Sequence, residues 1–125
     1  MGLLNALFGN ASKISKESMQ EEYEPLFAHG EQVEQAYELV RDHMLFTNRR
    51  LILIDKRGVT GHKVEYHSIP YRSITHFSVE TAGHFELDAD LKLWIAGTHE
   101  PLDLKFNFRA NIYEVQAVLA SYVLG

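Results

Sequence analysis

Residues 47–96 consist of short apolar and polar runs separated by turn residues, and no helical period fits inside them. Lys63–Ile69 and Phe77–Thr81 alternate with a period of two, and Phe85–Ile95 alternates for longer than a usual strand. The run Leu51–Ile54 is short and rich in β-branched residues. This pattern predicts consecutive antiparallel strands.

Alternation already begins near Gln32, where the pattern places Val33, Gln35, Tyr37 and Leu39 on one face of a strand. The spacing of the runs predicts about seven strands in a mainly β fold. Between the runs lie residues suited to reversing the chain: Asp55–Gly58, Gly61, Pro70, Ala82–Gly83 and Gly97–Pro101.

The C-terminal residues instead have a helical period. Asn111, followed three residues later by Glu114, predicts the cap of a helix that covers an open end of the sheet. One stripe of this helix is apolar: Ile112, Val115, Val118, Leu119, Tyr122 and Val123.

Residues 1–30 form a predicted N-terminal helical arm, and residues 31–125 form the β domain. Ser18–Glu21 has the pattern of a capping box, and Pro25 predicts a break near Glu24. A further helical turn then runs to His29 and ends at Gly30. A first short helix has an apolar face that could pack on its own domain, on a neighbouring subunit or on a membrane: Leu3, Leu4, Leu7 and Phe8.

Composition narrows the classes of function. A chain of 125 residues fits one domain, and no apolar run approaches the length of a membrane helix. Twelve basic and seventeen acidic residues give a net charge of −5, which argues against nucleic-acid and anionic-membrane binding. The chain has no cysteine, so disulfides, thiolate metal sites and a cysteine nucleophile are excluded, and a cytoplasmic location is expected.

Five stretches carry a resemblance to a known family: Gly30–Val33, Phe46–Ile52, Lys63–Tyr71, Ser73–Gly83 and Leu91–Trp94. They resemble the bacterial pleckstrin-homology-like domains. The resemblance implies seven strands in two near-orthogonal antiparallel sheets, closed by the C-terminal helix. It also implies a ring-shaped cyclic homo-oligomer, for which we expect a pentamer, with a polar strand-built surface suspected of binding other proteins. It implies no activity and no catalytic residues.

We expect the partner surface on a hairpin of Lys63–Ile69 and Thr75–Thr81. A turn at Pro70–Ser73 would place His67 opposite His76 and their polar neighbours on the same side. The apolar residues Val64, Tyr66, Phe77 and Val79 would then face inward. The predicted partner-binding residues are Glu65, His67, His76, Ser78 and Glu80.

Metal sites are weaker interpretations of the same residues. His67, His76 and a nearby carboxylate could hold zinc, but a solvated polar face explains them more simply. The acidic residues Glu86, Asp88 and Asp90 lack the glycine and glutamate that complete a calcium loop. We therefore predict no metal, no cofactor and no catalytic residue.

Basic residues cluster in one part of the sequence and could bind phosphate: Arg49, Arg50, Lys56, Arg57 and Lys63. The loop Val40–His43, where related eukaryotic domains hold phosphoinositides, has one arginine beside an aspartate, which argues against binding of a lipid headgroup.

We predict a non-enzymatic, ring-forming protein-interaction module, with a peripheral membrane or phospholipid adaptor as the alternative.

Overall fold

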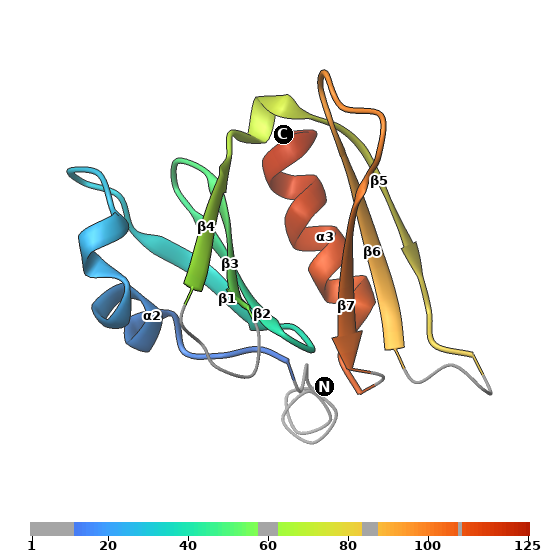
Figure 1. Ribbon diagram of the computed structural model, residues 1–125, viewed down its shortest axis with the longest axis horizontal. Helices are drawn as coiled ribbons and strands as arrows, with labels where there is room; N and C mark the ends of the chain where they lie inside the picture. The colour runs from blue at the N-terminus through green and yellow to red at the C-terminus, as the bar shows by residue number, and fades with distance from the viewer. Residues whose placement is uncertain (1–11, 58–62, 84–87, 108) are drawn as a thin grey trace. The chain divides into compact units, whose positions relative to one another are not determined.

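The computed structural model describes residues 12–57, 63–83, 88–107 and 109–125 (Figure 1). The apolar residues of the first predicted helix and residues 85–87 of the predicted Phe85–Ile95 strand lie outside the described residues. The described part contains seven antiparallel strands and a C-terminal helix, which confirms the predicted mainly β class. The chain divides into two compact units, Lys13–Ser73 and one that includes Ile74–Gly125.

The unit Lys13–Ser73 is built on a four-stranded antiparallel sheet in the order β1-β2-β3-β4. Helix α2 (Lys16–Glu22) and the 3-10 turn η1 (Glu24–Leu26) precede the sheet, and α2 packs on β1 (Figure 1). The strands are β1 (Val33–Glu38), β2 (Asp42–Thr47), β3 (Leu51–Arg57) and β4 (Lys63–Ile69).

A hydrophobic core lies between α2 and the sheet. Met19 and Tyr23 bring apolar surface from the helix, and β1, β2 and β3 supply the rest. Burial of this area is the main force that holds a seven-residue helix, which would be marginal alone, onto the sheet. The cluster comprises Met19, Tyr23, Val33, Ala36, Leu45, Ile52 and Ile54, with Ile14, Leu26 and Phe27 packed against it.

The predicted face of β1 is wrong because the strand contains a bulge. The register with β2 shifts between Val33 and Gln35. The extra residue reverses the alternation, so Val33 shares the α2 core with Ala36, while the buried Tyr37 points to the opposite face. A strict period of two cannot reveal such an insertion.

Helix α2 begins at Lys16, three residues before the start that the predicted capping box implies. The capping residue is Ser15 and not Ser18. The Ser15 side chain accepts a hydrogen bond from the Ser18 N–H at 3.1 Å. The predicted break is confirmed, because α2 ends at Glu22, Tyr23 is its C-cap, and Pro25 lies in the first turn of η1. Gly30 has a φ of +77°, a left-handed conformation that glycine adopts without strain.

The unit that includes Ile74–Gly125 contains a three-stranded antiparallel sheet in the order β5-β6-β7. On β6, Ala89, Leu91 and Leu93 are buried and alternate with partly exposed polar residues, as predicted. Helix α3 (Ile112–Val123) contacts β5 and β6 and buries Ile112, Val115 and Leu119 (Figure 1). The strands are β5 (Ile74–Glu80), β6 (Asp88–Ile95) and β7 (Leu102–Asn107).

The predicted cap of α3 is confirmed. The Asn111 side chain accepts a hydrogen bond from the Glu114 N–H at 3.2 Å. Among the helices of the described ranges, none has the length and apolar character needed to cross a bilayer.

Candidate functional site

The hairpin predicted for the partner surface does not form. Strand β4 pairs with β3, and β5 pairs with β6, so His67 and His76 belong to different sheets. A 3-10 turn, η2 (Tyr71–Ser73), joins the two strands. The Tyr71 hydroxyl donates to the carbonyl oxygens of Thr47 at 2.6 Å and Arg50 at 2.9 Å. These bonds tie η2 to the turn between the end of β2 and the start of β3.

The two β4 residues of the predicted surface, Glu65 and His67, lie on one face of the strand but differ in exposure. Glu65 is exposed and opposite Asp55, while His67 is half-buried and opposite the buried Leu53. Val64 and Tyr66, expected to face inward, are instead 36% and 45% exposed. They lie on the face of the sheet that carries Ile54 of the α2 core, where the Tyr66 ring meets the Tyr23 ring edge-on at 6.3 Å.

The β5 half keeps the predicted alternation. His76, Ser78 and Glu80 are exposed, while Phe77 and Val79 are half-buried opposite the buried Leu93 and Leu91. The zinc interpretation required His67 and His76 on one hairpin. Since that hairpin does not form, its geometric basis is lost.

An aromatic stack adjoins His76. The rings of His76 and Trp94 lie 4.4 Å apart at an interplanar angle of 15°. Thr75 supports the stack, because its hydroxyl donates to the Trp94 carbonyl oxygen at 3.2 Å and lies 3.0 Å from Nδ1 of His76. Trp94 was not among the predicted site residues, because strand pairing, and not alternation, brings it beside β5.

Charged residues continue this face across β6 and β7. Ser78 is opposite Lys92, and Glu80 is opposite Asp90. Nζ of Lys105 lies 3.2 Å from Asp90 and 3.5 Å from Asp103. Hydrogen bonding to Asp90, together with the charge of Asp103, raises the pKa of Lys105. We call this surface the polar face: His76, Ser78, Glu80, Asp90, Lys92, Trp94, Asp103 and Lys105.

A second polar arrangement holds the loops of the other unit together. The Glu31 side chain is fully buried, and its carboxylate accepts two hydrogen bonds from Arg50 at 2.9 Å. It also accepts from the Thr47 hydroxyl at 2.6 Å and from the Ala28 N–H at 2.9 Å. This fork geometry aligns two donors with two carboxylate oxygens, which is the strong form of an ion pair.

The Glu31 carboxylate is stabilised in its charged form. Burial alone would raise the pKa of Glu31, but hydrogen bonds from Arg50, Thr47 and Ala28 and the charge of Arg50 outweigh burial and lower the pKa to about 2. Glu31 and Arg50 are 19 residues apart and were not predicted as partners.

The predicted basic cluster is therefore divided. Arg50 is paired with Glu31, and Nζ of Lys56 lies 3.8 Å from the Glu22 carboxylate. Arg49 remains exposed on the turn between β2 and β3. The cluster is not one continuous basic surface.

Tyr23 and His43 form a further polar pair, with the Tyr23 hydroxyl 3.0 Å from Nδ1 of His43. Burial, and then the neighbouring Glu22, raises the pKa of Tyr23. Burial, and then Lys56, lowers the pKa of His43. The phenol therefore stays protonated at neutral pH, and the pair fastens α2 to β2 without supplying a tyrosinate nucleophile.

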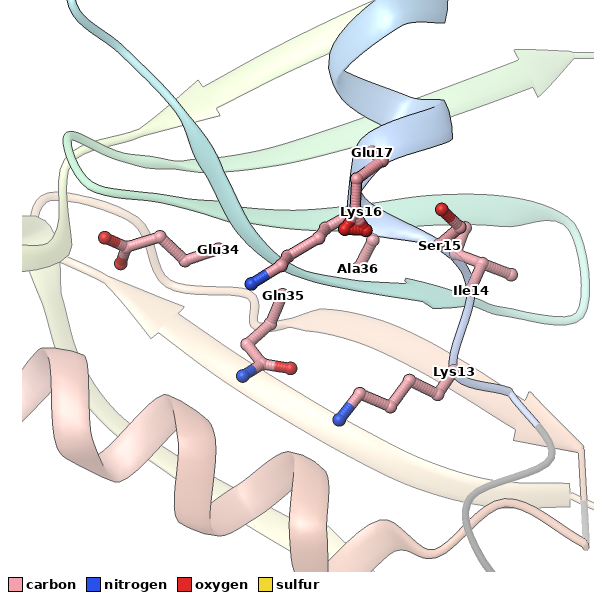
Figure 2. Close-up of a pocket in the computed structure, with 8 residues that line it drawn as sticks. All are labelled: Lys13, Ile14, Ser15, Lys16, Glu17, Glu34, Gln35 and Ala36. Carbon is pink, nitrogen blue, oxygen red and sulfur yellow. The ribbon is translucent and has the colours of Figure 1, made fainter. Parts of the chain in front are cut away.

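A shallow pocket of 270 Å³ marks the contact of the N-terminal segment with β1 (Figure 2). The Ile14 N–H donates to the Ala36 carbonyl oxygen at 3.0 Å, and the backbone of Lys13 forms an antiparallel β-bridge with that of Tyr37. Lys16 and Glu17 give this pocket charges of both signs. The segment covers part of the edge of β1, as edge strands commonly require.

The chain belongs to the bacterial PH domain family, which it matches over residues 2–123. It is 51% identical over 122 residues to the uncharacterized protein YjqA of Bacillus subtilis (strain 168), covering 97% of this chain and 98% of YjqA. It is 32% identical over 110 residues to the uncharacterized protein YozO of the same strain, covering 88% and 94% of the two chains.

Solved structures support the same assignment. A pleckstrin homology domain from Shewanella amazonensis SB2B has a TM-score of 0.79 and 50% identity, covering 89% of this chain and 100% of that one. A DUF1696 family protein with a pleckstrin-homology domain from Shewanella loihica PV-4 has a TM-score of 0.77 and 47% identity, covering 92% and 98%. The predicted resemblance is confirmed.

Proposed function

We propose that this bacterial PH domain is a non-enzymatic module that assembles with copies of itself into a ring and binds a partner protein on its polar face. The observation that carries the proposal is the edge strand β5, which has one hydrogen-bonded neighbour, β6, among the described strands. A seven-residue edge leaves backbone donors and acceptors open to another chain.

Strand β7 is the other edge of the same sheet. Pairing the β5 edge of one copy with the β7 edge of the next is a heterologous contact, and such contacts generate rings when the rotation closes. The family resemblance favours five subunits. Each copy in a ring repeats the polar face, so that weak contacts with a partner gain avidity.

The polar face suits a protein partner. Its stacked His76 and Trp94 rings offer a flat aromatic area, and Lys92 and Asp90 add charges of both signs. Aromatic residues are enriched where protein interfaces bury surface. A net charge of −5 opposes nucleic acid as the partner.

We expect light scattering at tens of micromolar protein to give the mass of a cyclic oligomer, preferably a pentamer. A monomer at that concentration would contradict the proposal, and a dimer would indicate an isologous interface instead. Because successive N–H groups of a strand point to opposite edges, Ser78→Pro and Val79→Pro act on different sides of β5. The proline variant that keeps the native circular dichroism spectrum is expected to lose the oligomer.

Partner binding is expected to depend on the β5 half of the predicted surface. His76→Ala/Glu80→Ala removes the stack and a carboxylate and is expected to abolish capture of cross-linked partners, while lowering stability by no more than about 1 kcal/mol. Glu65→Ala/His67→Ala, on β4, is the matched control and should retain capture. The reverse result would place the partner on β4, and unchanged capture by both variants would show that the polar face is only solvated.

A further inference from the structure

A pocket of 440 Å³ lies entirely within the unit Lys13–Ser73, and three of its lining residues are arginines. Arg49 comes from the turn between β2 and β3, Arg50 immediately precedes β3, and Arg72 comes from η2. The remaining walls are Leu26, Phe27, Ala28, Glu31, Ser68 and Pro70.

The positive charge of Arg50 is already paired with the carboxylate of Glu31. Its guanidinium donates to both oxygens of Glu31, to the Leu26 carbonyl oxygen at 2.7 Å and to the Ser68 hydroxyl at 2.7 Å. Glu31, the single carboxylate among the lining residues, is neutralised by the same contacts. Arg50 is therefore a wall of the pocket.

Arg49 and Arg72 supply the pocket with two positive charges. Both are exposed, and neither side chain forms an ion pair with a residue of the described ranges. A guanidinium presents a rigid fork of donors that matches the oxygens of a phosphate or carboxylate. Ser68 accepts from Arg50 and retains its own O–H as a further donor.

The elements that carry these arginines are held in place. Thr47 Oγ1 accepts from the N–H groups of Arg49 at 3.0 Å and Arg50 at 2.9 Å. Tyr71 fixes η2, and with it the backbone of Arg72, to the same turn. A site built on such a frame loses little conformational freedom when a ligand binds.

We propose that this pocket binds a small organic oxyanion, a phosphate monoester or carboxylate carried on an apolar body. The two arginines hold the anion, and Leu26, Phe27 and Pro70 contact the apolar part. The volume lies within the range of small-molecule sites, and an apolar lining with a few convergent polar groups is their usual composition. The pocket residues belong to the unit Lys13–Ser73, whereas the polar face and the β5 and β7 edges belong to the unit that includes Ile74–Gly125.

Phenyl phosphate is the probe of choice, observed by saturation-transfer NMR and calorimetry on the full chain. We expect it to bind with a Kd below about 1 mM and at least about fivefold more tightly than inorganic phosphate. Benzyl alcohol, which lacks the anion, should not bind measurably. Equal affinity for both phosphates would contradict the apolar contact, and no binding of either would overturn the site.

Arg49→Ala/Arg72→Ala is expected to weaken phenyl phosphate at least about tenfold, since charge-assisted hydrogen bonds are lost. Arg41→Ala/Lys63→Ala removes the same net charge from exposed positions outside the pocket and should leave the affinity unchanged. Arg49→Lys/Arg72→Lys keeps the charge without the fork and should fall between. Equal losses in the alanine pair and its control would reduce the effect to general electrostatics and overturn the proposal.

A lipid headgroup offers the same chemistry as a soluble phosphate. Co-sedimentation with vesicles of phosphatidylcholine and phosphatidic acid distinguishes the two sources. We expect soluble phenyl phosphate to bind and the vesicles to leave the protein in the supernatant. Vesicle binding that the Arg49→Ala/Arg72→Ala variant abolishes, with no binding of phenyl phosphate, would overturn the soluble ligand in favour of a membrane lipid.

Discussion

Replacing Arg50 with alanine is expected to lower the free energy of unfolding by about 3–5 kcal/mol, because it leaves the buried Glu31 carboxylate without its cation. The loss is a large part of the total stability of a domain of this size. It also removes the donors that bind the Leu26 carbonyl oxygen and the Ser68 hydroxyl. Urea denaturation at a fixed protomer concentration measures the effect as a shift in midpoint at constant slope.

Arg49→Ala is the matched control, one residue away but exposed, and should change stability by no more than about 0.5 kcal/mol. Glu31→Gln/Arg50→Ala completes a double-mutant cycle in which the two losses are not additive. If the losses of Glu31→Gln and Arg50→Ala simply add, the two side chains contribute independently and the ion pair is not the source of the stability.

Alternation identified the strands well because each strand buries one face, and side chains on a strand change face at every residue. The β6 residues Ala89, Leu91 and Leu93 are an example. Alternation contains no information on which strands pair. Lys63–Ile69 and Thr75–Thr81 were predicted as the two arms of a hairpin. In the folded chain the Tyr71 hydroxyl instead binds carbonyl oxygens more than twenty residues away, and the strands on either side of η2 pair with other strands.

Local errors had equally specific causes. A bulge after Val33 reversed the faces of β1, and the cap of α2 was assigned to Ser18 although Ser15 also precedes the helix. Both serines have the same capping chemistry, so the choice depends on which start lets Met19 and Tyr23 reach the sheet. Tertiary packing decides that choice.

The candidate sites were only partly accessible from sequence for the same reason. His76, Ser78 and Glu80 were found because they alternate along one strand, whereas Trp94 joins them through the pairing of β5 with β6. Arg49 and Arg50 were both predicted as members of a basic cluster, but their different roles could not be predicted. Arg50 is paired with Glu31, which lies 19 residues away in the sequence and reaches Arg50 only in the folded chain, whereas Arg49 stays exposed.

Acid is expected to remove the contribution of Glu31 to stability. The folded pKa of about 2 lies below the ordinary value of 4.5, so the folded state favours the charged carboxylate. The stabilisation is complete above about pH 4.5 and declines as the pH falls toward 2, by about 3 kcal/mol in total. Urea midpoints measured from pH 7 to pH 2.5 follow most of this decline.

Other carboxylates also titrate in this range, so the difference between wild type and Glu31→Gln isolates the residue. The variant is expected to be less stable than wild type at pH 7, with a difference that shrinks as the pH falls below about 4.5, because protonation makes the wild-type carboxyl neutral as well. Glu24→Gln, an exposed carboxylate in η1, should follow the wild-type curve. A difference in stability between wild type and Glu31→Gln that stays constant from pH 7 to pH 2.5 would show that Glu31 is not preferentially charged in the folded state. The hydrogen bonds from Arg50 would then stabilise the fold without any contribution from the charge of Glu31.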